Sequence, residues 1–390
     1  MKKFKWPIII LAALALIYFA TTLIVPVQYD KALNKTMALP PYKVSAEAQA
    51  LYNSLDFIAD LHCDALLWSR DLKKKNSVGH VDFPRMQEVN MALQAFTIVT
   101  KSPAGQNFSK NSADAFDNIT LLSFLQGRPI TSWFSLFKRS VYQSRRLHDF
   151  AEDYNDEFIV VKSWADLERL IAARKENKNI IGGFLGIEGA HCLEGNLENL
   201  DKLYAEGVRM IGPTHFFDNE LGGSAHGITK GGLSDFGHQV IDRMDELGMI
   251  IDVAHAAPAM IDDILEQTTR PILVSHTGVR GTKDNIRNLS DDHIRRIAAN
   301  GGLICIGFFK GAVNTPLTEG IVEAMKHVKS IAGVKCIALG SDYDGAATVP
   351  FDVTGLPLLV EEMMKEGFTE SEIRAIMGEN IKRYLLKQLP

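Results

Sequence analysis

Several short apolar runs in this chain end on a histidine or a carboxylate. "IDVAH" stops at His255, "ILVSH" stops at His276, and "FLGIEG" reaches Glu188 before its last glycine. Imidazole and carboxylate groups are common ligands of zinc and related divalent ions. A catalytic metal site keeps one coordination position open for water, whereas a structural zinc site is closed by four protein ligands. Runs that end in this way therefore indicate metal chemistry.

A second group of candidate ligands surrounds Cys63. Side chains alternate along an extended strand, so His62 and Asp64 should point to one face of "DLHCD" and Cys63 to the other. An H-x-D triplet is a weak motif by itself, but three histidines and two carboxylates suit two divalent ions with Glu188 between them. An arginine partner for Glu188 is the alternative, because a buried carboxylate needs compensation.

Two further strand ends carry groups that are suited to catalysis. "GSDYDG" offers Asp342 and Asp344, and we predict Asp342 as the base because it lies nearer the strand end. His215 follows the apolar run in "GPTH", where its imidazole could stabilise a developing oxyanion. A hydrogen-bonded structural histidine is the alternative for His215. A proton acceptor and an oxyanion donor beside metal ions are the parts that hydrolysis requires.

The elements that must position these residues alternate between strand and helix. The predicted strands lie within residues 55–62, 92–100, 180–189, 207–215, 248–255, 270–276, 301–309 and 335–344. Ser163 and Ser290 are suited to cap two of the helices between them. Nearly continuous apolar strands indicate a parallel sheet covered on both faces. Eight βα units predict a (β/α)8 TIM barrel, which collects the C-terminal ends of its strands at one face.

Composition excludes several classes of protein. The 390 residues are 46% hydrophobic and 23% charged, which is typical of a globular chain. The net charge is −5 and no basic patch follows the N-terminus, so we expect no nucleic-acid partner. The four cysteines are scattered without a C-x-x-C pair, and no disulfide framework is implied.

The N-terminus predicts a membrane anchor. Residues 7–27 carry no charge, and about 20 apolar residues suffice to cross a bilayer. Lys2, Lys3 and Lys5 should stay in the cytoplasm, which places the rest on the periplasmic or extracellular side. We predict an uncleaved signal anchor at 1–29, a linker at 30–45 and a catalytic domain at 46–390. A cleaved signal peptide is the alternative.

A long insertion at residues 107–150 separates the second and third predicted strands, and we expect two helices in and around it. Within it, "ITSWFSLFKRSV" mixes aromatic and basic residues. We predict a packed helix there. Contact with the membrane or with a partner subunit is the alternative.

The motifs occur together in an order that resembles one family. "DLHCD", "GIEGAH", "THFFDN", "DVAHA", "VSHTGVRGTKDNIRN" and "GSDYDG" follow one another as in the membrane dipeptidases, the renal dipeptidase-like zinc peptidases of peptidase family M19. The resemblance extends from about residue 56 to about residue 385. The glycine-rich loop after His215 is similar to that of bacterial members. His226 in this loop is either an extra substrate contact or, as we expect, a solvated loop histidine.

The resemblance implies a metal-dependent hydrolase barrel of the amidohydrolase-like type, and it gives each candidate a role. It implies five ligands of two zinc ions: His62 and Asp64 on one ion, His255 and His276 on the other, and Glu188 bridging them. His215 would contact the scissile group and Asp342 would transfer the proton. Arg287, which has no signal of its own in the sequence, would bind the free carboxylate of the substrate.

The function that the resemblance implies is hydrolysis of dipeptides by a zinc-dependent metallo-dipeptidase, through a hydroxide that bridges two ions. Acceptance of a C-terminal D-residue and formation of a homodimer are further family traits. Three alternatives stay open. A related metal hydrolase could act on N-acyl amino acids, other small carboxylate-bearing amides or lactones. The barrel could be an inactive, membrane-tethered binding protein, and manganese or cobalt could replace zinc.

Overall fold

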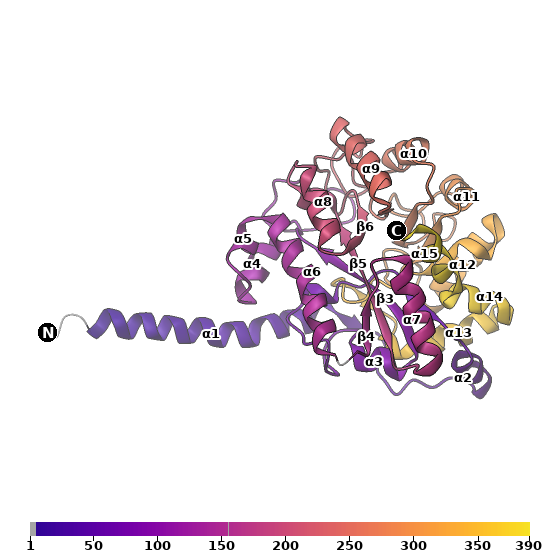
Figure 1. The fold of residues 1–390 in the computed structure, drawn as a ribbon, viewed down its shortest axis with the longest axis horizontal. Helices are drawn as coiled ribbons and strands as arrows, with labels where there is room; N and C mark the ends of the chain where they lie inside the picture. The colour runs from indigo at the N-terminus through magenta and orange to yellow at the C-terminus, as the bar shows by residue number, and fades with distance from the viewer. Residues whose placement is uncertain (1–4, 155) are drawn as a thin grey trace.

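A parallel barrel forms the centre of the molecule in the computed structural model, which describes residues 5–154 and 156–390 (Figure 1). Its strands are β2 (Ile58–Asp60), β3 (Met91–Val99), β5 (Ile181–Glu188), β6 (Val208–Gly212), β7 (Ile250–Ile251), β8 (Leu273–Thr277), β9 (Leu303–Ile306) and β10 (Ile337–Leu339). Every hydrogen-bonded pairing among them is parallel. Each strand overlaps one of the eight predicted runs, so the predicted (β/α)8 fold is confirmed.

The barrel strands form two curled sheets that meet at two seams. One sheet has the order β2-β3-β5-β6-β7, and the other has the order β10-β9-β8. Val253 N donates to Leu273 O at 2.8 Å across one seam, and Leu61 N donates to Leu339 O at 3.1 Å across the other. These bonds close the sheets into a ring, so the C-terminal ends of all eight strands face the same side.

Three short strands lie outside this order. β4 (Phe158–Val160) pairs with the beginning of β5. β1 (Lys35–Thr36) pairs with β11 (Thr348–Val349), which belongs to the loop after β10. The second pair joins the segment behind the N-terminal helix to a loop at the C-terminal face of the barrel.

Helices follow the strands and cover the outside of the barrel (Figure 1). They are α2 (Ala46–Asn53), α3 (Phe83–Glu88), α4 (Asn118–Leu125), α5 (Thr131–Phe134), α6 (Leu136–Asp153), α7 (Trp164–Glu176), α8 (Glu198–Ala205), α9 (Asp235–Leu247), α10 (Pro258–Gln267), α11 (Asp291–Ala299), α12 (Leu317–Ala332), α13 (Leu356–Lys365), α14 (Glu370–Arg374) and α15 (Asn380–Gln388). Short turns of other helix types are η1 (Ala65–Leu67), η2 (Ala190–Leu193), η3 (Val334–Cys336), η4 (Val353–Gly355) and η5 (Ala375–Glu379). Ser163 and Ser290 cap α7 and α11 with their hydroxyl groups, as predicted.

Two apolar layers hold the barrel together. The larger layer fills the space between the strands and the surrounding helices. The smaller layer closes the N-terminal end, where Ile250, Leu273 and Leu303 begin their strands and meet Tyr384 of α15 in one cluster. Full burial of one such aliphatic side chain contributes about 1.5–3 kcal/mol. Because the N-terminal end is filled with apolar side chains, the polar groups collect at the opposite end.

The N-terminal helix α1 (Lys5–Leu33) extends away from the barrel (Figure 1). From Trp6 on it is long and apolar enough to cross a membrane, a property that a signal sequence shares. Its last turns pack on the barrel, where Asp30 Oδ2 accepts a hydrogen bond from Arg70 Nε at 2.8 Å. Residues 30–45 thus contain the end of α1 and the paired strand β1, while the domain boundaries at 29 and 45 stay a prediction. Lys2 and Lys3 lie outside the described residues.

The insertion at residues 107–150 contains α4, α5 and most of α6, so three helices form where two were predicted. The segment 130–141 divides between packed and exposed parts. Ser140 and Val141 of α6 are buried, whereas Ile130 and Phe134 at α5 are exposed. A packed helix is therefore what the structure shows for α6, but not for α5.

Candidate active site

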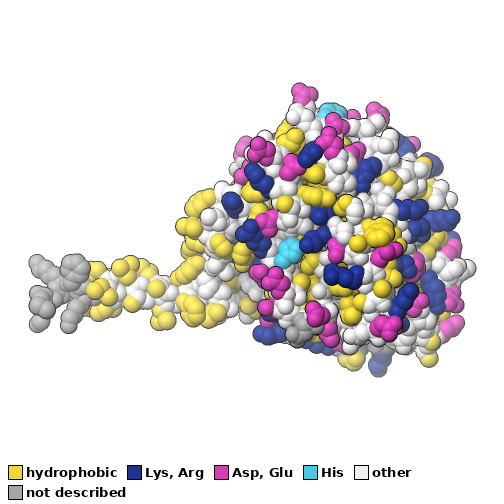
Figure 2. All heavy atoms as spheres, viewed as in Figure 1, with side chains coloured by type: hydrophobic (Ala, Val, Ile, Leu, Met, Phe, Trp, Pro, Cys, Tyr) yellow, Lys and Arg dark blue, Asp and Glu magenta, His cyan; other side chains and the backbone are white. Residues whose placement is uncertain are grey.

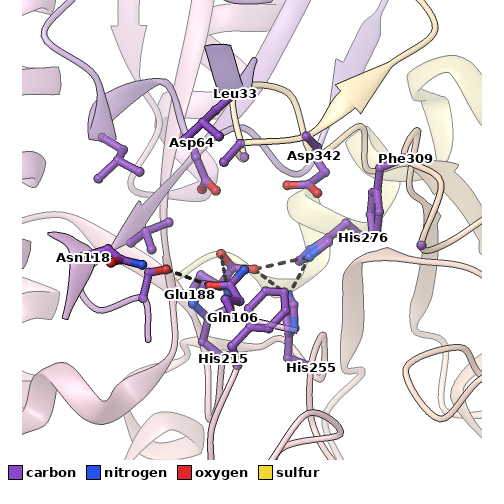
Figure 3. A pocket seen from close by; sticks show the side chains of 18 of the residues that line it. Leu33, Asp64, Gln106, Asn118, Glu188, His215, His255, His276, Phe309 and Asp342 are labelled. Atoms are coloured by element: carbon purple, nitrogen blue, oxygen red, sulfur yellow. Dashed lines mark hydrogen bonds and ion pairs between the residues drawn. The ribbon is translucent and has the colours of Figure 1, made fainter. Parts of the chain in front are cut away.

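The predicted ligands meet at the C-terminal face of the barrel. Glu188 is the last residue of β5 and His276 lies in β8, whereas the other ligands occupy turns that follow their strands. Side chains that Figure 3 labels around this cavity include Asp64, Glu188, His215, His255, His276 and Asp342. The barrel geometry thus brings residues from six strand ends into one cluster, as the strand-end pattern predicted.

Glu188 lies at the centre of this cluster. Its Oε1 is 2.9 Å from His255 Nε2, 3.3 Å from His276 Nε2 and 3.6 Å from His62 Nε2. Its Oε2 is 3.2 Å from His215 Nε2. Among the described residues no arginine lies within salt-bridge distance of this carboxylate. Imidazoles therefore face both of its oxygens, and the alternative of an arginine partner receives no support.

Asp64 approaches the cluster from the end of β2. Its Oδ1 lies 3.6 Å from His62 Nε2. β2 ends two residues before His62, so strand alternation alone does not bring these two ligands together. Cys63 forms an isolated parallel bridge with Tyr343, and Asp64 N donates to Tyr343 O at 2.9 Å. This pairing holds the segment against the loop after β10, and it turns Cys63 into the apolar core, as predicted.

A hydroxyl group fixes which nitrogen of two histidines faces the cavity. Ser275 Oγ donates to Asp252 Oδ2 at 2.6 Å, so its single hydrogen is used. His62 Nδ1 at 2.9 Å and His276 Nδ1 at 3.1 Å must then donate to this oxygen. Their Nε2 atoms are left without hydrogens and point to Glu188, as metal-binding imidazoles require. Sequence reasoning missed Ser275 and Asp252, although both stand inside the strand-end motifs that end on His276 and His255.

Burial keeps the histidines of the cluster neutral. Desolvation lowers the pKa of His62 to about 3. It also lowers the pKa of His215, His255 and His276 well below the usual value. Neutral imidazoles have a free lone pair, which is the form that binds metal ions.

The carboxylates of the cluster show the opposite effect. Burial raises the pKa of Asp64 to about 7. Burial, together with the negative charges of Asp64 and Asp342, raises the pKa of Glu188 well above its usual range. The pKa of Asp342 is raised for the same reasons, with Asp64 as the main neighbouring charge. A cation between these groups would relieve their repulsion and their loss of hydration.

The donor atoms fit divalent metal ions. Three groups of nitrogen and oxygen donors lie within 4.8 Å of one another: His62, Asp64 and Glu188; Glu188, His215 and His255; and His62, His276 and Asp342. His62 Nε2 is buried and has no hydrogen-bond partner. A mixed set of neutral imidazoles and carboxylates is typical of catalytic sites for zinc and related ions.

Arg287 supplies a buried positive charge at the edge of the cluster. It lines the same cavity, is 5% exposed, and donates from Nη2 to His276 O at 2.6 Å. Burial lowers its pKa to about 10, so the guanidinium stays charged at neutral pH. No carboxylate among the described residues forms a salt bridge with it. A buried cation without a partner is suited to bind an anionic group of a ligand.

Two site residues adopt a strained backbone. His255 has φ 63° and Asp342 has φ 62°, in the left-handed region that non-glycine residues rarely enter. Such a conformation costs about 1–3 kcal/mol and often occurs at functional sites. Here it turns both side chains from the ends of β7 and β10 toward the cavity.

His226 is placed differently from our expectation. A solvated loop histidine was predicted, but the side chain is fully buried. Its ring stacks on Phe216 with centroids 4.5 Å apart, and its centroid lies 5.1 Å from that of His255. Its Nδ1 lies 2.9 Å from Phe108 O. The glycine-rich loop therefore folds inward and forms a wall of the site, because aromatic residues from two segments enclose the imidazole.

The cavity in front of the cluster has a volume of about 380 Å³, which is within the usual range for small-molecule sites. Its wall opposite the ligands is mainly apolar. Leu33 comes from α1, Ile119 and Leu122 come from α4, and Phe108 and Phe309 come from loops. The cavity can thus enclose a small molecule that has one polar, hydrolysable group and apolar substituents.

A (β/α)8 barrel with a cluster of metal-ligating side chains at the C-terminal ends of its strands defines a metal-dependent hydrolase. The family model "Membrane dipeptidase (Peptidase family M19)" matches residues 45–388. The chain therefore belongs to the membrane dipeptidase family, as its motifs predicted, and it is a metallo-dipeptidase by class.

Solved structures share the fold. A dipeptidase described as a metallo peptidase of family M19 aligns with a TM-score of 0.69 and 22% identity, over 85% of this chain and 98% of that one. A metallo peptidase from Rhodobacter sphaeroides, liganded with a phosphinate mimic of the dipeptide L-Ala-D-Ala, gives the same score and identity, over 85% and 99%. The probable dipeptidase PvdM from Pseudomonas aeruginosa aligns with a TM-score of 0.73 and 18% identity, over 88% and 97%.

Proposed function

We propose that this chain is a dipeptidase with two zinc ions that cleaves dipeptides carrying a free C-terminal carboxylate. The observation that carries the proposal is the position of Glu188, whose two oxygens both face neutral, buried imidazoles. One carboxylate in that position can serve two cations at once. His62 and Asp64 would hold one ion, and His255 and His276 would hold the other.

Ions bound at these residues would polarise the peptide carbonyl and lower the pKa of a water molecule between them. Asp342 is the proton carrier in this proposal. Its raised pKa suits a group that accepts a proton from water and then delivers it to the leaving amine. The neutral ring of His215, beside Glu188 Oε2, offers an N–H group to the oxyanion that forms on the substrate.

Arg287 would select the substrate by its carboxylate. A guanidinium presents two parallel N–H groups to a carboxylate, and burial strengthens this pairing. Because Arg287 is hydrogen-bonded to the backbone of His276, it would hold the C-terminus of the substrate close to the cluster of metal ligands. A substrate held at this end must be short, which favours dipeptides over longer chains.

Three finer features belong to the proposal. The phosphinate mimic of L-Ala-D-Ala bound by the Rhodobacter sphaeroides peptidase supports acceptance of a C-terminal D-residue. The apolar helix α1, with Lys2 and Lys3 before it, supports a single-pass anchor with the catalytic domain on the extracytoplasmic side. Formation of a homodimer stays a prediction from the resemblance.

The test uses the full chain in detergent, loaded with zinc, and a panel of L-L and L-D dipeptides. We expect release of free amino acids from dipeptides with a free C-terminus, and loss of this activity on chelation. C-amidated dipeptides should resist hydrolysis. Arg287→Lys keeps the charge but loses the paired donors, and it should raise KM for dipeptides about 10- to 100-fold, equivalent to about 1.5–3 kcal/mol.

Other outcomes would redirect the assignment. Turnover of N-acyl amino acids or lactones without turnover of dipeptides would support the related metal hydrolase. Stoichiometric metal binding without turnover of any of these substrates would support an inactive binding protein. Equal turnover of amidated and free dipeptides would remove the role of Arg287.

A further inference from the structure

A surface feature that catalysis does not use is an apolar ridge beside α1. The ridge spans residues 116–134, and its exposed apolar side chains are Phe116, Leu121, Phe124, Ile130 and Phe134. They are five of the ten large hydrophobic side chains described as exposed outside α1, and Phe134 is 83% exposed. Figure 2 shows hydrophobic side chains gathered on this side of the molecule, where the helix meets the globular part. Such a concentration indicates an interaction surface.

The ridge contains two charged residues, Asp117 and Arg128, and the carboxylate of Asp117 pairs with Arg139 Nη1 at 2.6 Å. Between residues 118 and 137 the one charged residue is Arg128, and it is buried. Its guanidinium donates to Leu67 O inside the protein. Apart from the paired carboxylate of Asp117, the exposed face of the ridge is therefore uncharged, which suits hydrocarbon rather than water or a polar protein surface.

The contact between the ridge and α1 shows which part of the helix lies beside the ridge. Tyr18 OH donates to Phe124 O at 2.9 Å, and the two rings lie 5.0 Å apart. From Trp6 to Tyr18 an α-helix covers only about 18 Å, whereas the hydrocarbon core of a bilayer is about 30 Å thick. A spanning α1 therefore needs the turns beyond Tyr18, as far as Val27, to lie in hydrocarbon. At that depth Phe124 lies beside the apolar part of α1.

Basic groups lie where α1 leaves its apolar run. Ser69, Arg70 and Asp71 line two neighbouring pockets. Pro26 and Val27 line the first of these pockets, and Arg128 and Arg146 line the second. Arg128 and Arg146 donate to backbone carbonyls, and neither forms a salt bridge within the described part of the chain. Asp71 and Asp149, which line the same pocket, offset part of their charge. Arg128 is buried, but Arg146 is only half-buried, and its guanidinium lies at a level that suits the anionic headgroups of a bilayer.

We propose that the apolar ridge inserts into the outer leaflet of the bilayer that α1 crosses, so that two contacts hold the barrel at the lipid surface. This inference rests on the proposed role of α1 as a membrane anchor. The proposal also connects the lipid contact with the active site, because one face of α4 belongs to the ridge and the other face lines the catalytic cavity. Leu121 and Phe124 face outward, whereas Ile119 and Leu122 line the catalytic cavity.

The test measures the depth of single dye-labelled positions in the full chain. The four native cysteines are buried, so a thiol-reactive dye should label an introduced surface cysteine selectively. Phe134→Cys reports on the ridge, Leu14→Cys reports on the span, and Trp164→Cys is the matched control on α7, another exposed aromatic. The proteins are reconstituted in vesicles of phosphatidylcholine and phosphatidylglycerol that contain nitroxide-labelled lipid. We expect quenching at positions 134 and 14 and none at 164.

Each other outcome separates the ridge from the anchor. Quenching at position 14 without quenching at 134 would keep the anchor and overturn the ridge proposal. A blue-shifted but unquenched dye at 134 would show that protein, such as a second copy of this chain, covers the ridge, and it would also overturn the proposal. Absence of quenching at both positions would overturn both assignments.

A charged ridge variant gives an independent readout. Phe134 lines neither the catalytic cavity nor the core, so Phe134→Asp should leave dipeptide hydrolysis in detergent unchanged. In vesicles it should reduce quenching of a dye at Leu121→Cys several-fold. Unchanged quenching at that position would contradict insertion of the ridge.

Discussion

Two buried clusters of charged side chains lie next to each other after β10, and they share one loop. Asp342 belongs to the catalytic cluster, whereas Asp344 belongs to a network with Arg70 and His80. Asp344 Oδ1 forms an ion pair with Arg70 Nη2 at 2.8 Å and accepts a hydrogen bond from His80 N at 2.7 Å. Arg70 also pairs with Asp30 of α1. Asp342 has no cationic side chain within salt-bridge distance among the described residues.

The pKa values of these two aspartates shift in opposite directions. The positive charge of Arg70 and the hydrogen bond from His80 N hold the pKa of Asp344 below its usual value despite burial. Burial and the charge of Asp64 raise the pKa of Asp342. The protein thus neutralises one cluster by itself, whereas it leaves the other with like charges that need an added cation. The comparison separates a structural ion network from a site built for metal and catalysis.

Removal of the central ligand should have the largest effect. Glu188→Gln keeps the shape of the side chain but removes the charge that would face both ions. We expect loss of measurable dipeptide hydrolysis and of at least one bound metal ion per chain. Metal analysis of the purified variant, together with circular dichroism to show that it is folded, checks this. Retention of two tightly bound ions would show that Glu188 does not bridge them.

Asp342→Asn should separate catalysis from metal binding. The amide cannot carry a proton, so kcat should fall about 10²- to 10⁴-fold. Metal content and Tm should stay near those of the unchanged chain, since no pairing is lost. A variant that loses both metal and activity would make Asp342 a ligand instead of the base.

Asp344→Asn, two residues further on, should do the reverse. It leaves Arg70 with Asp30 as its remaining acidic partner, and loss of one partner of a buried ion pair costs about 3–5 kcal/mol. Denaturant unfolding should show this loss, while kcat of the folded fraction should change much less than in Asp342→Asn. A larger effect on kcat than on stability would contradict the assignment of Asp344 to a structural network and of Asp342 to catalysis.

Ser275→Ala should weaken the metal site without touching a ligand. The change removes the acceptor that fixes the ring orientation of His62 and His276. Loss of such a supporting hydrogen bond typically lowers metal affinity about 10- to 100-fold. Competition with a chelator measures the affinity, and Ser275→Thr, which keeps the hydroxyl group, is the matched control. Equal affinities of the two variants would count against this role.

The clusters should also differ in how pH changes stability. Asp64 has a folded pKa of about 7 against an ordinary value of 3.8, so the chelated protein binds more protons when folded. Its stability should therefore fall as pH rises from about 4 to 7, by at most about 1.4 kcal/mol per unit for this group. Asp344 has a lowered pKa, and its contribution should be lost only as pH falls below the ordinary value. Tm measured across this range with zinc and with chelator checks the sign, because bound metal should remove the loss at neutral pH.

The sequence allowed prediction of the features that depend on local patterns. The eight apolar runs identified the strands, and the rule that barrel strands present their C-terminal ends at one face brought His62, Glu188 and His276 together. Ser275 and Asp252 were missed because their role depends on contacts between neighbouring strands. The burial of His226 was missed because Phe108, more than 100 positions away in the chain, covers it. The pairing of β1 with β11 involves segments that have no pattern of their own.

The attachment of α1 to the barrel has a consequence for how the enzyme would meet its substrates. If the predicted linker at residues 30–45 were a flexible coil of 16 residues, its r.m.s. length would be about 20–24 Å and the domain would move through a broad volume. The Asp30–Arg70 pair and the β1–β11 pairing instead hold the end of the anchor against the domain. In a chain anchored by α1, as proposed, the entrance to the cavity would then keep a constant distance from the membrane and a constant orientation to it. The rate at which the enzyme meets its substrate would depend on the concentration of dipeptide in the layer of solution next to the membrane. Dipeptides released at the membrane would therefore reach the cavity before dipeptides from the bulk solution.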